Sequence, residues 1–152
     1  MPYLVDNKKI SMRLQKFSYL VTTLSILLFT VSCNKTSTET LNEMVSPTAV
    51  LKYSGVFMGR QNQNVSGEAL IVLENGKYAL KLMNFKSDNG PDLKVYLSKE
   101  STPSSHISLG DLKSTNGNQV YEIEGMPDFK QYRYALIHCE RFNHLFGSAE
   151  LK

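Results

Sequence analysis

The most constraining feature of this sequence is a pair of apolar runs joined by a tight turn. Residues 68–73 read Glu-Ala-Leu-Ile-Val-Leu and residues 78–82 read Tyr-Ala-Leu-Lys-Leu, with Asn75 and Gly76 between them. Asn-Gly accepts positive φ at both central positions of a type I′ turn, whose twist matches that of the flanking strands. The segment is therefore predicted to be a β-hairpin. Alternate side chains of its second strand, Lys81 among them, are expected to face solvent.

Similar short runs recur throughout residues 51–152, separated by clusters of Gly, Asn, Asp, Ser and Pro. This spacing is typical of an all-β domain, and no stretch keeps a helical period. About eight strands are predicted, which favours an antiparallel sandwich or a small barrel. The predicted strands cover residues 55–59, 68–73, 78–82, 93–97, 105–109, 119–123, 132–139 and 147–151. The strand at 132–139 is the most apolar and is expected to be central.

The N-terminal segment has the pattern of a secretory signal. Residues 8–16 carry four basic side chains, and an apolar run of 13 residues follows at 19–31. A membrane-spanning helix needs about 20 apolar residues, so this run is too short to be a stable span. A basic region, a short apolar region and a small residue behind it are typical of a signal peptide. Residues 1–32 are therefore predicted to be a signal peptide, whose true start could be Met12.

The residues behind the apolar run are Thr30-Val31-Ser32-Cys33. They resemble the lipobox of bacterial lipoproteins, which implies that Cys33 receives a lipid and becomes the new N-terminus. The alternative is that Cys33 is only a small residue at the end of a core helix, but the basic entry and the polar exit favour lipidation. Residues 33–50, rich in Ser, Thr and Asn, are predicted to be the lipidated cysteine and a flexible tether. The domain would then be held at a membrane of the bacterial envelope, outside the cytoplasm.

The charge distribution argues against a nucleic-acid partner. The formal charge of the chain is +3, and residues 1–32 contribute all of it, with four basic residues against one acidic residue (4 − 1 = 3). The rest is balanced, with 17 − 4 = 13 basic and 14 − 1 = 13 acidic residues. Binding to phosphate backbones needs a clustered surplus of Lys and Arg. The partners expected from the sequence are the membrane, through the lipid, and an envelope redox partner or ligand.

Three segments of the domain, at residues 84–98, 108–121 and 132–151, form a distinctive combination. Their most specific parts are the Asn-Gly-Pro-Asp-Leu run at 89–93 and the Cys-x-x-Phe pattern that begins at Cys139. Over residues 54–151 the domain resembles the DM-thirteen family, which is described as an electron-transfer domain and occurs beside DOMON domains in animal proteins of the Skeletor type. The resemblance implies a redox role for Cys139, either as a free thiol or as a haem ligand.

The residues themselves leave two interpretations of Cys139 open. It is the one thiol that remains once Cys33 is lipidated, and an unpaired cysteine in an exported protein can be reactive. It can equally be a small apolar residue of the core. Strand alternation groups Cys139 with Ala135 and Ile137 on one face, and His138 with Leu136 on the other.

Cofactor binding has limited support in the sequence. A noncovalent haem would use Cys139 with His138 or His144, but there is no Cys-x-x-Cys-His attachment motif. No metal site is predicted, because Cys139 and His144 have no second half-site. The loop at 87–92 carries oxygen ligands, yet it lacks the spacing of a calcium loop and is interpreted as turn chemistry. Hydrolase and phosphate-loop motifs are absent.

The leading hypothesis is a redox or electron-transfer accessory domain on a lipoprotein, in which Cys139 is the working residue. The alternative is a non-catalytic binding module, in which Cys139 belongs to the core and a sheet face or loop binds a ligand or protein. Exposure of the Cys139 sulfur separates the two hypotheses, since thiol chemistry needs access to it.

The lipid anchor gives the first testable prediction. Replacing Cys33→Ser removes the acceptor thiol, so the protein is expected to lose palmitate labelling and to leave the membrane fraction. Fractionation and labelling of cells that express the two proteins measure both effects. The matched control is Cys139→Ser, which should keep both properties. A Cys33→Ser protein that still fractionates with membranes would contradict the prediction.

Overall fold

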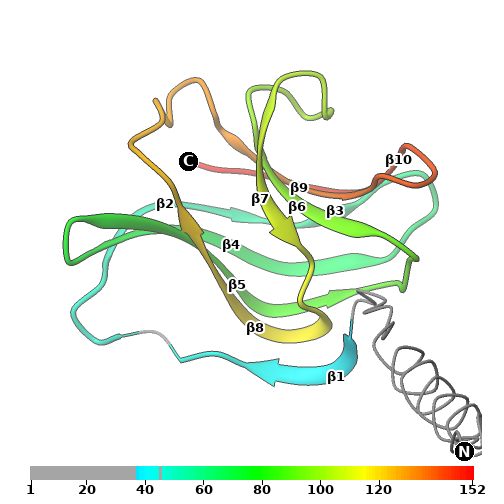
Figure 1. Cartoon of the computed structure of the whole chain (residues 1–152), viewed down its shortest axis with the longest axis horizontal. Coiled ribbons are helices and arrows are strands. Elements are labelled where there is room, and N and C mark those ends of the chain that lie inside the picture. Colours follow the sequence, from blue (N-terminus) through cyan, green and yellow to red (C-terminus); the bar gives the residue numbers. More distant parts are fainter. Residues whose placement is uncertain (1–36, 45) are drawn as a thin grey trace, which may run out of the picture. The chain divides into compact units, whose positions relative to one another are not determined.

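The computed structural model describes residues 37–44 and 46–152, which form ten strands in two sheets (Figure 1). The predicted signal peptide and Cys33 lie outside the described residues. Within the described part of the chain, no helix is long and apolar enough to cross a membrane. The strands are β1 (Ser37–Asn42), β2 (Val50–Val56), β3 (Met58–Gly59), β4 (Val65–Glu74), β5 (Lys77–Ser87), β6 (Leu93–Ser98), β7 (His106–Asp111), β8 (Ser114–Ile123), β9 (Tyr134–Cys139) and β10 (His144–Glu150).

The prediction of an all-β sandwich is confirmed, and the two sheets do not close into a barrel. One sheet has the order β1-β8-β5-β4-β2 and the other β3-β10-β9-β6-β7. All pairings are antiparallel except that of β1 with β8, which is parallel. The count rises from about eight to ten because β1 was not predicted and because the strand expected at 55–59 is divided at Phe57 between β2 and β3. The most apolar predicted strand, β9, is central in its sheet, as expected.

The β4–β5 hairpin is confirmed in register. Glu74 pairs with Lys77, so Asn75 and Gly76 form a two-residue turn. Their φ angles are 50° and 78°, which are the positive values that a type I′ turn requires. The inward faces of the two sheets pack against each other and enclose the core.

Lys81 corrects one expectation about this hairpin. Its side chain was expected to be solvated, but only 2% of it is exposed. Lys81 lies on β5, the middle strand of its sheet, where Leu70 of β4 and Val120 of β8 flank it. Its Nζ is 3.9 Å from the Glu74 carboxylate, so the long aliphatic stem is covered while the ammonium group reaches a partner.

Within the segment predicted to be a flexible tether, at 33–50, residues Ser37–Asn42 form strand β1. This strand covers the open edge of β8, which would otherwise leave backbone groups unpaired. Polar side chains join the pairing: the Asn116 amide donates to the Thr40 hydroxyl of β1 at 2.7 Å, and Lys113 forms an ion pair at 2.8 Å with Glu43, the residue that follows β1. The contacts of β1 are polar, so its sequence lacks the alternating apolar pattern of a strand. Its composition, rich in Ser, Thr and Asn, therefore resembles that of a flexible linker.

Gly117 permits the close approach of β1 to β8. Its φ is 105°, and a Cβ at this position would lie 1.8 Å from the carbonyl oxygen of Leu41 on β1. Gly110 has nearly the same φ, 106°, but a Cβ there would meet nothing within 4 Å. Substituting alanine at Gly110 would therefore change stability through the backbone conformation alone, whereas substituting it at Gly117 would add the cost of displacing β1.

This pair gives a prediction about stability. Gly110→Ala should lower the free energy of unfolding by about 1–2 kcal/mol, the cost of the backbone conformation alone. Gly117→Ala should cost about 1–3 kcal/mol more, because β1 must also move. Urea unfolding of residues 35–152 measures the stability, and hydrogen exchange of the β1 amides should increase only in Gly117→Ala. Equal losses in the two variants would show that β1 does not pack as described.

Candidate functional site

Cys139 is the last residue of β9, and its side chain faces the core. None of its surface is exposed, and its thiol is free. Its cross-strand neighbours are Leu93 on β6 and His144 on β10. Ala135 and Ile137 share the core with it, which confirms the alternation predicted for this strand. The folded domain therefore shields the sulfur from solvent, whereas thiolate chemistry needs exposure.

His144 lies beside Cys139, because directly paired residues of antiparallel strands project on the same face of the sheet. Its ring packs edge-on against Phe146, with 5.6 Å between the ring centroids. The Nε2 atom of His144 is buried and has no hydrogen-bond partner. The structure thus brings Cys139 and His144 together, on the inner side of the sheet.

His138 projects from the opposite face of β9. It is 5% exposed, and its Nδ1 atom is buried without a hydrogen-bond partner. One haem iron could not be bound by both His138 and Cys139, since the sheet lies between their side chains. Cys139 is also not among the residues that line the cavity beside His138. These three residues, Cys139, His138 and His144, therefore do not fit a common haem site.

The described part of the chain also has no candidate metal site. Within residues 37–44 and 46–152, no group of three or more His, Cys, Asp or Glu side chains lies close enough together to hold a metal ion.

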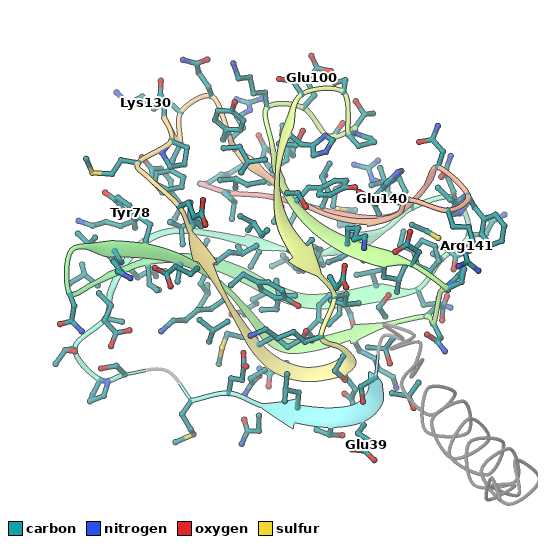
Figure 2. The ribbon with its side chains drawn as sticks, viewed as in Figure 1. Glu39, Tyr78, Glu100, Lys130, Glu140 and Arg141 are labelled. Atoms are coloured by element: carbon teal, nitrogen blue, oxygen red, sulfur yellow. The ribbon has the colours of Figure 1, made fainter. Side chains whose placement is uncertain are left out.

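The side chains around His138 form a cluster on the outer face of the second sheet, which we call the outer-face cluster: Tyr96, His106, His138 and Glu140. The Tyr96 ring stacks on His106, with 3.9 Å between centroids and 21° between planes. Its centroid is 5.7 Å from that of His138. The Tyr96 hydroxyl donates a hydrogen bond to the carboxylate of Glu140, a residue labelled in Figure 2.

Burial determines the protonation of this cluster. Desolvation raises the pKa of Tyr96 well above its ordinary value, and the hydrogen bond to Glu140 raises it further. Desolvation also lowers the pKa of His138, against the opposing effects of Asn143 and Glu140. At neutral pH the Tyr96 phenol and the His138 imidazole are therefore both neutral.

A hollow of about 450 Å³ lies next to the cluster. The β6–β7 loop forms one wall, and the hydroxyl of Ser98 holds this loop by donating to the Thr102 carbonyl at 2.9 Å. The lining is uncharged and mixes amide, hydroxyl and apolar groups, which suits a small neutral ligand better than an ion. The lining residues are Gln61, Thr102, Pro103, Ser104, His138, Asn143 and Leu145.

Sequence reasoning missed most of this cluster. Of its four residues only His138 is a site residue predicted from the sequence, whereas Tyr96, His106 and Glu140 belong to no motif. Alternation along β6 does separate Tyr96 from Val95 and Leu97, which face the core. The pairing of Tyr96 with Glu140, 44 residues apart, depends on strand order, and no local pattern reports it.

The fold and the site together define a β-sandwich domain with a shielded thiol inside one sheet and an aromatic and histidine cluster outside it. The family model described as Electron transfer DM13 matches residues 57–151, which is more than half of the chain. The chain therefore belongs to the DM13 family, and the resemblance found in the sequence is confirmed. Neither the curated proteins nor the solved structures contain a match.

The burial of His138 predicts a pH dependence of stability. Because the folded-state pKa is lowered, the unfolded chain binds more protons below pH 6.5, and stability falls as the pH drops below that value. The slope from this one group cannot exceed about 1.4 kcal/mol per pH unit. Urea unfolding of residues 35–152 at pH 7, 6 and 5 should show the loss, and His138→Gln should remove it. Identical slopes in both proteins, with His106→Gln as a control, would contradict the prediction.

Proposed function

We propose that this chain is a lipid-anchored protein of the bacterial envelope whose DM13 domain is an electron-transfer accessory. The observation that carries the proposal is that the Electron transfer DM13 match extends over nearly the whole sandwich, residues 57–151. The signal-like segment and the lipobox-like residues before Cys33 support the location. A redox partner in the same envelope compartment would exchange electrons with the domain.

The working residue in this proposal is Cys139. Its sulfur is buried, but the residue ends β9 and is followed directly by the exposed Glu140. Strand ends open more readily than strand centres, and local opening costs less than global unfolding. We propose that opening of the adjoining turn gives a partner access to the thiol. A haem ligand role has no support from the arrangement of Cys139, His138 and His144.

The burial of Cys139 favours a second candidate function, a non-catalytic binding module. In that case the cysteine is a structural core residue, and the hollow beside His138 takes a small neutral ligand. The two functions make opposite demands on the thiol, since only the first needs it to react in the native protein.

The discriminating experiment is a thiol titration of residues 34–152, in which Cys139 is the one cysteine. Electron transfer through Cys139 predicts that the thiol reacts in native buffer much faster than the protein unfolds, with little effect of low urea concentrations. A structural cysteine predicts reaction only through global unfolding, slowed about 10³-fold or more relative to the denatured chain. The Cys139→Ala protein supplies the baseline. Reaction at the unfolding rate would overturn the redox role and leave the binding module.

A further inference from the structure

The strand β1 limits how far the domain can lie from a lipid on Cys33. This inference rests on the lipidation of Cys33 that is part of the proposed function. Only three residues separate Cys33 from Ser37, where β1 begins. Four residue steps of extended chain span about 14 Å at most. The seventeen-residue tether expected from the sequence would have allowed any orientation, whereas this short connection holds one end of the sandwich near the membrane.

The register identifies that end, which we call the anchor end. Ser37 pairs with Ser114, so β8 also begins there. The β7–β8 connection lies against the start of β6, since Leu112 N donates to Leu93 O at 2.7 Å. The β9–β10 turn lies against the loop before β6, since Glu140 N donates to Asp92 O at 3.0 Å.

Figure 1 shows the start of β1 and the β9–β10 turn on the same side of the sandwich. The β4–β5 turn and the β8–β9 connection lie at the opposite end. Figure 2 shows the same arrangement, with Arg141 on one side and Tyr78 and Lys130 on the other.

The β9–β10 turn presents an apolar side chain at the anchor end. Phe142 is 69% exposed, and it is the one aromatic among the exposed large apolar side chains of the described residues. The turn is tight: Asn143 N donates to Glu140 O at 3.1 Å, and Asn143 has a φ of 47°. Phe142 therefore lies at the tip of a tight turn, with its side chain exposed to solvent. An exposed aromatic ring held in this way is suited to the interface between lipid headgroups and acyl chains.

A cation lies next to this ring. Arg141 is exposed, and within the part of the chain that the structure describes no carboxylate forms an ion pair with it. In contrast, the acidic groups of the neighbouring loop have partners: Asp88 accepts from Asn64, and Asp92 pairs with Lys94 at 2.9 Å. An unpaired cation beside an apolar side chain favours an anionic lipid surface.

We propose that the Glu140–Asn143 turn is a membrane-contact site, in which Phe142 enters the lipid interface and Arg141 contacts anionic headgroups next to the lipid on Cys33. The anchor and the turn then give two points of attachment at one end of the sandwich. Two points restrict the orientation of the domain, whereas a lipid on a long tether would leave it free.

The experiment uses the full chain, expressed with its own signal and reconstituted into vesicles that contain anionic lipid. The sequence has no Trp, so Phe142→Trp introduces a single fluorescent reporter at an exposed position. Phospholipids with brominated acyl chains quench tryptophan on contact. We expect the Phe142→Trp protein to lose about half or more of its emission in brominated vesicles, as a ring at the interface should.

The matched control is Met126→Trp, since Met126 is 82% exposed and lies in the β8–β9 connection at the opposite end. Its emission should not change. If both proteins float with the vesicles and neither is quenched, the anchor stands and the membrane-contact site is overturned. If neither protein floats with the vesicles, the lipid anchor itself fails, and the inference fails with it. A blue shift of Phe142→Trp in native membranes, without bromine quenching, would indicate a protein surface in place of lipid and would also overturn the proposal.

Discussion

Strand β9 lies in the middle of the second sheet and is buried on both faces, and the roles available to its residues follow from this position. One face carries Ala135, Ile137 and Cys139 into the space between the sheets. The other carries Leu136 and His138, both buried, and His138 lies beside the β6–β7 loop. Adjacent residues of one strand therefore enter separate environments, one apolar and one polar. A shared function for His138 and Cys139 would need a path through the backbone between them.

The outer face of this sheet supplies hydrogen-bond partners to the polar side chains that are buried there. Such partners matter because a buried polar group without one is costly. On the outer face, Glu140 and the loop carbonyl of Pro103 supply acceptors to Tyr96 and His106. His138 keeps an unpaired Nδ1 even there. Unsatisfied buried groups in native proteins call for an explanation, and a ligand in the neighbouring hollow would supply the missing hydrogen bond.

Local sequence signals predicted the parts of the fold that local physics determines. The Asn75-Gly76 turn, the central position of β9 and the two faces of that strand all follow from turn chemistry, hydrophobicity and alternation. The sequence could not reveal features that depend on strand order. Lys81 is buried because of its place within a sheet. The strand β1 pairs through polar side chains, so it has the composition of a linker and nothing in its own sequence indicates its parallel partner.

The pairing of β1 with β8 shortens the connection between Cys33 and the sandwich, and the length of that connection decides which partners an anchored domain could reach. A long flexible tether lets a domain reach partners over a wide volume but lowers the effective concentration at any one of them. If Cys33 carries the proposed lipid, the sandwich would reach only partners at the same membrane, and it would meet them in a limited set of orientations. The Glu140–Asn143 turn is also the segment that adjoins Cys139 and carries the acceptor for Tyr96. If the proposed membrane contact and the proposed opening both occur, they would act on the same stretch of backbone, and the position of the domain at the membrane would then be coupled to the accessibility of Cys139.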